Sequence, residues 1–99
     1  MSNIHVKYTH SLNPEETRKR VEEIAKDLKK EYKMDYVWKG DRLLFKRSGA
    51  AGNLDLKDGF IELNIKLGMV LAPLKGKIEK TIKQNIVAEM SGKKGTKLA

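Results

Sequence analysis

The 99-residue sequence contains no cysteine, and this absence excludes several kinds of chemistry. Disulfides, zinc–thiolate sites and thiol nucleophiles all require that residue. Only His5 and His10 could supply imidazole ligands, and they stand on either side of an expected strand-to-helix boundary. Because no carboxylate pair of fitting geometry accompanies them, we expect neither a bound metal nor a cofactor.

Long apolar runs are also missing. The longest covers six residues, Met69 to Leu74, whereas a membrane-spanning helix needs about 20. The first residues of the chain alternate in polarity and do not have the composition of a signal or transit peptide. Together with the lack of cysteine, these features predict a cytoplasmic protein without a transmembrane segment.

Charge, by contrast, is plentiful: 34% of the residues are charged and the formal net charge is +8. The length and the 39% of hydrophobic residues predict one globular domain, over residues 1–90, followed by a basic flexible tail over residues 91–99. From Lys75 onward the chain has seven lysines and two glutamates. Such a balance predicts attraction to nucleic acid, anionic lipid or an acidic partner.

The first third of the chain predicts a strand and then a helix. Residues 4–10 alternate between apolar and polar side chains, a pattern typical of a half-buried strand. Asn13 is a favourable N-cap and Pro14 suits the first helical position. A helix over residues 14–32 follows, with an apolar stripe that repeats every three or four residues. The stripe consists of Val21, Ile24, Ala25, Leu28 and Tyr32.

Two hairpins are predicted in the middle of the chain, across Gly40-Asp41 and Asp58-Gly59. A two-residue turn at the first site pairs Trp38 with Leu43, and at the second it pairs Leu56 with Ile61. Between the hairpins, the glycine-rich segment over residues 48–53 predicts a connection without regular structure.

A second helix is predicted over residues 71–90. Its inner stripe should contain Leu71, Leu74, Ile78, Ile82 and Ile86. The resulting order is β-α-β-β-β-β-α, in an α+β fold with a five-stranded, mostly antiparallel sheet of spatial order 2-3-4-5-1. Both helices should cover one face, because charged residues dominate the other face.

Four segments in this order resemble the "polyhydroxyalkanoic acid system" family of small bacterial proteins, over roughly residues 3–90. They are "HSL" at 10–12, "WKGD" at 38–41, "FKRSG" at 45–49 and "LGMVLAPLKGKIE" at 67–79. The resemblance implies an association with storage-polyester synthesis and action at the polyhydroxyalkanoate granule. It supplies no catalytic residues to transfer. The layout also resembles a reduced helix-grip fold, a likeness that concerns the fold alone.

These observations favour a non-enzymatic accessory protein that binds the polyhydroxyalkanoate granule, or a granule-associated protein, through an apolar loop and a basic C-terminal helix. Gly68 lets the chain change direction, so Met69 and Val70 should be at least partly exposed, whereas Leu71 and Leu74 should face inward. The candidate binding residues are Met69, Val70, Leu71, Lys75, Lys77, Lys80 and Lys83.

Alternative functions remain open at this point. The basic helix and tail could bind nucleic acid without sequence preference. Tyr36, Trp38 and Phe45 share a face and could line a site for a small apolar ligand. A second copy of the chain, as a homodimer, is a further possible partner. Hydrolase activity is not expected, because Ser11 lacks the sequence context of an activated nucleophile.

Overall fold

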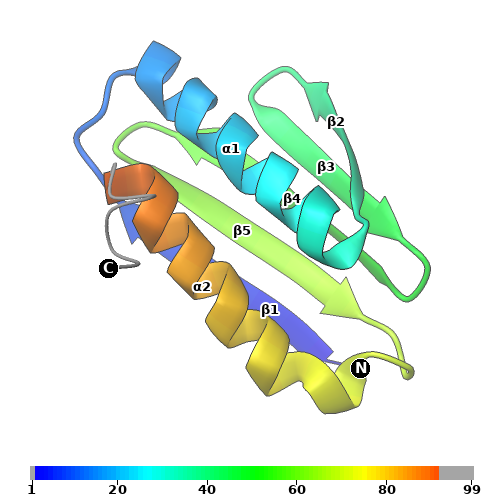
Figure 1. Cartoon of the computed structure of the whole chain (residues 1–99). Coiled ribbons are helices and arrows are strands. Elements are labelled where there is room, and N and C mark those ends of the chain that lie inside the picture. The colour runs from blue at the N-terminus through cyan, green and yellow to red at the C-terminus, as the bar shows by residue number, and fades with distance from the viewer. Residues whose placement is uncertain (1, 92–99) are drawn as a thin grey trace.

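The computed structural model of the chain describes residues 2–91, so most of the predicted tail lies outside the described residues. Five strands form one sheet, and two helices lie side by side on one of its faces (Figure 1). The elements are β1 (Ser2–Thr9), α1 (Pro14–Tyr32), β2 (Asp35–Lys39), β3 (Arg42–Arg47), β4 (Ala50–Lys57), β5 (Phe60–Leu67), the 3₁₀ helix η1 (Ala72–Leu74) and α2 (Lys75–Ser91).

The strand order is β1-β5-β4-β3-β2, which is the predicted order counted from the other edge. Every neighbouring pair is antiparallel, and the α+β class and the β-α-β-β-β-β-α succession are confirmed. The predicted register is also correct, since Trp38 lies opposite Leu43 and Leu56 lies opposite Ile61. A shift of one residue would have reversed the side chains between the two faces.

The segment over residues 48–53 is not the irregular connection that we expected. Only Ser48-Gly49 forms a turn, with Gly49 at a φ of +86°, and β4 begins directly afterwards at Ala50. Gly52 pairs with Phe45 and Ile65 within the sheet, and the backbone of β5 approaches it closely. A Cβ atom at Gly52 would lie only 2.2 Å from the Asn64 carbonyl oxygen.

The second helix begins later than predicted. Residues 72–74 form a 3₁₀ turn around Pro73, and the α-helix starts at Lys75. A 3₁₀ helix has three residues per turn instead of 3.6, so Leu74 is rotated away from the buried stripe. Leu74 is 49% exposed, and its expected inward position is therefore wrong. Leu71 does pack against the core, as predicted.

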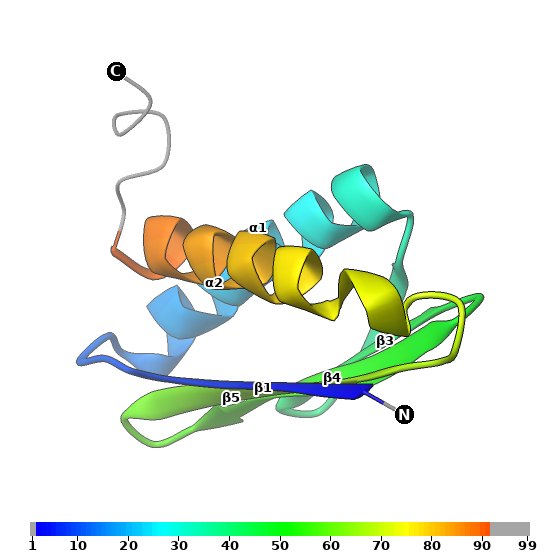
Figure 2. The ribbon, with the colours of Figure 1, turned by 90° about the horizontal axis from the view of Figure 1, so that it is seen from below.

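The core fills the single layer between the sheet and the two helices, which Figure 2 shows from the side. Strands β1, β3 and β5 bury alternate side chains, and each helix buries one stripe. Because both helices lie on the same side, the opposite face of the sheet stays uncovered. The most completely buried large side chains are Ile4, Ile24, Leu28, Met34, Leu43, Leu54, Ile61, Leu63, Ile65, Leu67, Ile82 and Ile86.

One carboxylate fastens α1 to the edge strand β2. Glu22 accepts a hydrogen bond from the Tyr36 hydroxyl and another from the Trp38 indole nitrogen, each at 2.7 Å. The Arg18 guanidinium lies 3.9 Å from the centre of the Trp38 ring. The bonds from Trp38 and Tyr36 lower the pKa of Glu22, and the bond to Glu22 raises the pKa of Tyr36.

Gly52→Ala should destabilise the fold, because the new methyl group would collide with backbone atoms of β5. We expect a loss of about 1–3 kcal/mol in the free energy of unfolding, measured by urea denaturation. Gly76→Ala is the matched control, since nothing lies within 4 Å of its added Cβ. That change in α2 should instead stabilise by roughly 0.5–1 kcal/mol. A stable Gly52→Ala variant would contradict the close approach of the strands.

The Glu22 contacts predict a specific pH dependence. Because the folded state lowers the pKa of Glu22 below its ordinary 4.5, the stabilisation is present above that value and is lost as the pH falls through the folded pKa. Glu22→Gln should cost about 1–2 kcal/mol at pH 7, and this difference from the parent should shrink as the pH falls below 4.5. Urea titrations at each pH test this, with Glu15→Gln as the control. A difference that stays constant with pH would exclude the charged hydrogen bonds as its cause.

Candidate interaction surface

Backbone hydrogen bonds hold the loop between β5 and α2 in one shape. The Gly68 amide donates to the Gly49 carbonyl at 2.9 Å, which ties this loop to the β3–β4 turn. The Gly68 carbonyl accepts from the amides of Leu71 and Ala72, at 3.2 and 2.9 Å. The two residues between these bonded positions are consequently presented at the apex of a closed turn.

Those two residues, Met69 and Val70, are the most exposed large hydrophobic side chains of the described chain, at 87% and 83%. We call the pair the apolar tip. Leu71, directly after it, turns inward and packs against the core. The neighbouring Leu71 side chain also lies 3.4 Å from the position of a Cβ on Gly49, so it supports the loop from beneath.

The lysines of α2 divide into paired and unpaired groups. Glu79 forms ion pairs with Lys75 at 3.8 Å and with Lys83 at 3.2 Å. Lys77 and Lys80 are exposed and make no ion pair within residues 2–91. Lys75 and Lys77 lie in the first turn, which contains no acidic residue, although the helix dipole disfavours cations there. Their position thus works against local stability.

Three further cations lie close to the loop and were missed in the sequence. Lys46 and Lys66 are both cross-strand neighbours of Ala51, and Arg47 precedes the Ser48-Gly49 turn. Counting charge along the sequence could not find them, because they come from two strands that only the register brings together. The sequence feature that could have indicated them is the lack of any carboxylate in residues 46–54 and 63–78.

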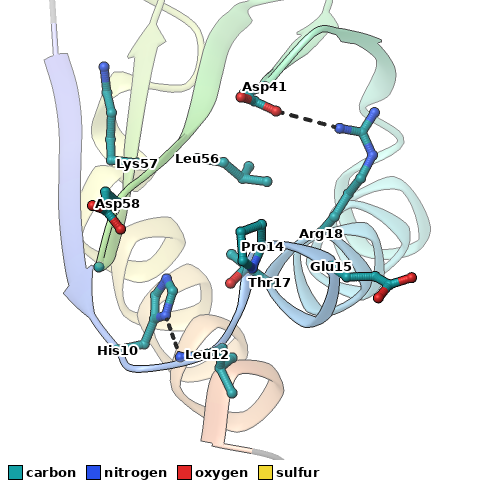
Figure 3. A pocket seen from close by; sticks show the side chains of 11 residues that line it. His10, Leu12, Pro14, Glu15, Thr17, Arg18, Asp41, Leu56, Lys57 and Asp58 are labelled. Atoms are coloured by element: carbon teal, nitrogen blue, oxygen red, sulfur yellow. Dashed lines mark hydrogen bonds and ion pairs between the residues drawn. The ribbon is translucent and has the colours of Figure 1, made fainter.

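A surface pocket of about 490 Å³ lies at the opposite end of β5, next to the β4–β5 turn and the start of α1 (Figure 3). The Leu12 amide donates to Nδ1 of His10 at 3.0 Å, and Nε2 of His10 is buried. The imidazole thus supports the entry to α1, as predicted, and neither ring nitrogen is available to solvent. Arg18 and Asp41 face one another across the pocket at 3.9 Å.

Among the residues that the structure describes, no group of three or more histidine, aspartate or glutamate side chains is arranged to hold a metal ion. Likewise, neither of the helices within residues 2–91 combines the length and the apolar character needed to cross a membrane.

The architecture and the exposed loop define a small α+β protein with one sheet, two helices on one face, and an apolar tip beside a basic helix start. A family model described as "Putative polyhydroxyalkanoic acid system protein" matches residues 4–90, which is most of the chain. The chain belongs to this polyhydroxyalkanoic acid system family, as its four sequence landmarks indicated. No curated protein and no solved structure matches it, so the helix-grip likeness stays a prediction.

The unfavourable position of Lys77 gives a test of the helix dipole argument. Lys77→Gln should raise the free energy of unfolding by about 0.3–1 kcal/mol, because it removes a cation from the first turn of α2. Lys80→Gln removes another exposed cation, without an ion pair among residues 2–91, one turn later and should change stability less. Urea denaturation at low ionic strength compares the two variants. Equal effects would show that the dipole does not distinguish these positions.

Proposed function

We propose that this chain is a non-enzymatic accessory protein of polyhydroxyalkanoate storage that attaches to the granule surface through its apolar tip. Family membership supports the association with the polyhydroxyalkanoic acid system. The observation that carries the proposed contact is the exposure of Met69 and Val70 on a hydrogen-bonded loop. Such a role would place the protein at granules in the cytoplasm.

The physical argument is one of preorganisation. Full burial of one such side chain contributes roughly 1.5–3 kcal/mol, so two adjacent side chains form a substantial contact. Because the backbone of the loop is already fixed by hydrogen bonds, little conformational entropy is lost on binding. The lysines at the start of α2 can remain at the polar boundary while the tip enters the apolar phase. The predicted residues Lys75, Lys77, Lys80 and Lys83 would then act through charge, and Leu71 would support the loop.

The lack of catalysis is part of the proposal. His10 is the side chain that the sequence offers next to Ser11, and its two nitrogens are respectively hydrogen-bonded and buried. It is therefore badly placed to accept a proton from a nucleophile. A small-ligand site between sheet and helices has little support either, because Glu22 holds Tyr36 and Trp38 and large side chains fill that layer.

A granule-associated protein is the other partner that fits the apolar tip, and protein-free polyester granules distinguish it from the polymer surface.

Nucleic-acid binding is less well supported. Of the four lysines in the first half of α2, Lys75 and Lys83 share Glu79, which leaves a charge of +3 from four lysines and one glutamate. Binding to duplex DNA that is lost at high salt would favour that alternative.

Met69→Ser combined with Val70→Ser should weaken co-sedimentation with polyhydroxyalkanoate granules at least tenfold. Two contacts worth roughly 1.5–3 kcal/mol each are removed, and each 1.4 kcal/mol corresponds to a factor of ten. The melting temperature should stay close to that of the parent, since both side chains are exposed.

A matched control is Val37→Ser combined with Val87→Ser, which removes exposed apolar side chains from β2 and from the outer side of α2. This variant should bind granules like the parent. Equal loss in both variants would show that general surface hydrophobicity causes the binding. A large drop in the melting temperature of the tip variant would show that the loop belongs to the core.

A further inference from the structure

Cations from three different elements lie at the same end of the molecule as the apolar tip. Two segments, residues 46–54 and 63–78, together contain five cations and no carboxylate. We call these five residues the basic end: Lys46, Arg47, Lys66, Lys75 and Lys77. Elsewhere on the described chain, several positive side chains form ion pairs with carboxylates, such as Arg20–Glu16 and Arg42–Asp55.

The fold brings the two segments together at one end of the molecule. The Gly68–Gly49 hydrogen bond joins them directly, and Figures 1 and 2 both show the β3–β4 turn, the β5–α2 loop and the start of α2 at this end. A shallow depression of about 290 Å³ connects Lys46, Arg47 and Lys66 with Gly68, the residue that precedes the tip.

The charges of the basic end remain largely uncompensated. Arg47 donates to the carbonyl oxygens of Tyr32 and Ser48, which are neutral acceptors. Within residues 2–91, Lys46, Lys66 and Lys77 make no ion pair, although Asp35 lies opposite Lys46 in the strand register. Lys75 pairs with Glu79 at 3.8 Å. This end of the molecule therefore combines five cations with the two exposed apolar side chains of the tip.

We propose that this surface docks onto an anionic lipid layer, with the apolar tip in the acyl region and the basic end on the phosphate groups. This inference rests on the proposed function, because it names the chemistry of the surface that the tip meets. An anionic lipid layer offers negative groups directly above an apolar phase, which matches both parts. A nucleic-acid duplex would satisfy the cations but leave Met69 and Val70 without an apolar partner.

Vesicle flotation tests the charge requirement. Vesicles of phosphatidylcholine with 30% phosphatidylglycerol, a composition chosen for the assay, should bind the parent chain, and vesicles of phosphatidylcholine alone should bind it at least tenfold more weakly. A triple variant with Lys46→Gln, Lys66→Gln and Lys77→Gln should lose at least tenfold in partition onto the anionic vesicles. Raising the salt concentration should weaken the binding of the parent.

The matched control changes the same number of lysines away from the basic end. Its three substitutions are Lys19→Gln, Lys39→Gln and Lys57→Gln, all at exposed positions. The two triple variants have the same net charge, but the control leaves the basic end intact. It should therefore change partition less than twofold. Equal losses in both variants would overturn the proposal, because net charge and not the basic end would then control binding.

The lack of cysteine allows the tip itself to be followed. Val70→Cys and Val87→Cys each introduce a single thiol at an exposed position, for labelling with an environment-sensitive fluorophore. On anionic vesicles, fluorescence should rise several-fold for the label at position 70 and stay nearly constant for the label at position 87. Equal responses, or no response at position 70, would overturn insertion of the tip.

Bare polyester granules, without lipid, separate this inference from the proposed function. Tip-dependent binding to bare granules with no binding to anionic vesicles would overturn the lipid inference and leave the granule function standing. Binding to anionic vesicles without binding to bare or lipid-coated granules would support the lipid surface and refute the granule function. Loss of vesicle binding when equimolar duplex DNA is added would overturn the choice of lipid over nucleic acid.

Discussion

Three two-residue turns set the register on which the rest of this structure depends. Each has a glycine with positive φ, at positions 40, 49 and 59, which lets the strands reverse without an intervening loop. Because side chains alternate across a strand, the register decides which residues face the helices. It also places Ala50 opposite Leu67, so that β5 ends beside the β3–β4 turn. The site of the apolar tip thus follows from the same constraint as the core.

The two helices use different means to cover the sheet. Isoleucines 78, 82 and 86 bury the inner stripe of α2, and α2 packs beside α1 over the strands. Helix α1 additionally holds the edge strand β2 through the two hydrogen bonds to Glu22. Neither arrangement involves Met69 or Val70. Their exposure is consequently independent of the forces that stabilise the domain, and contact residues can change without loss of the core.

The parts of the fold with strong local signals could be predicted from the sequence. Asp-Gly and Gly-Asp flanked by alternating residues indicated two turns, and the Asn13 cap with Pro14 located the start of α1. The strand at residues 50–53 could not be predicted, because alanine and glycine carry no alternating pattern. Its conformation is set by pairing with β3 and β5, which is a tertiary effect, and the close approach of β5 explains why position 52 is glycine.

The candidate surface was predictable to a similar extent. Gly68 indicated the change of direction that exposes the apolar tip, but the 3₁₀ turn that rotates Leu74 outward could not be foreseen from apolar spacing. The lysines that follow in α2 were visible because they are close in sequence. Lys46, Arg47 and Lys66 became part of the same surface only through strand pairing, since they are distant in sequence from α2.

The placement of an apolar loop directly before a basic helix therefore has a physical explanation. Lysines in the first turn of α2 are unfavourable for the helix, and exposed Met69 and Val70 are unfavourable in water. Local departures from stable sequence patterns are expected where a surface serves function. Here both departures occur at one end, beside a carboxylate-free pair of segments tied together by the Gly68–Gly49 hydrogen bond. A single interface with an apolar interior and a negative boundary would bury the two apolar side chains and compensate the charge of the lysines.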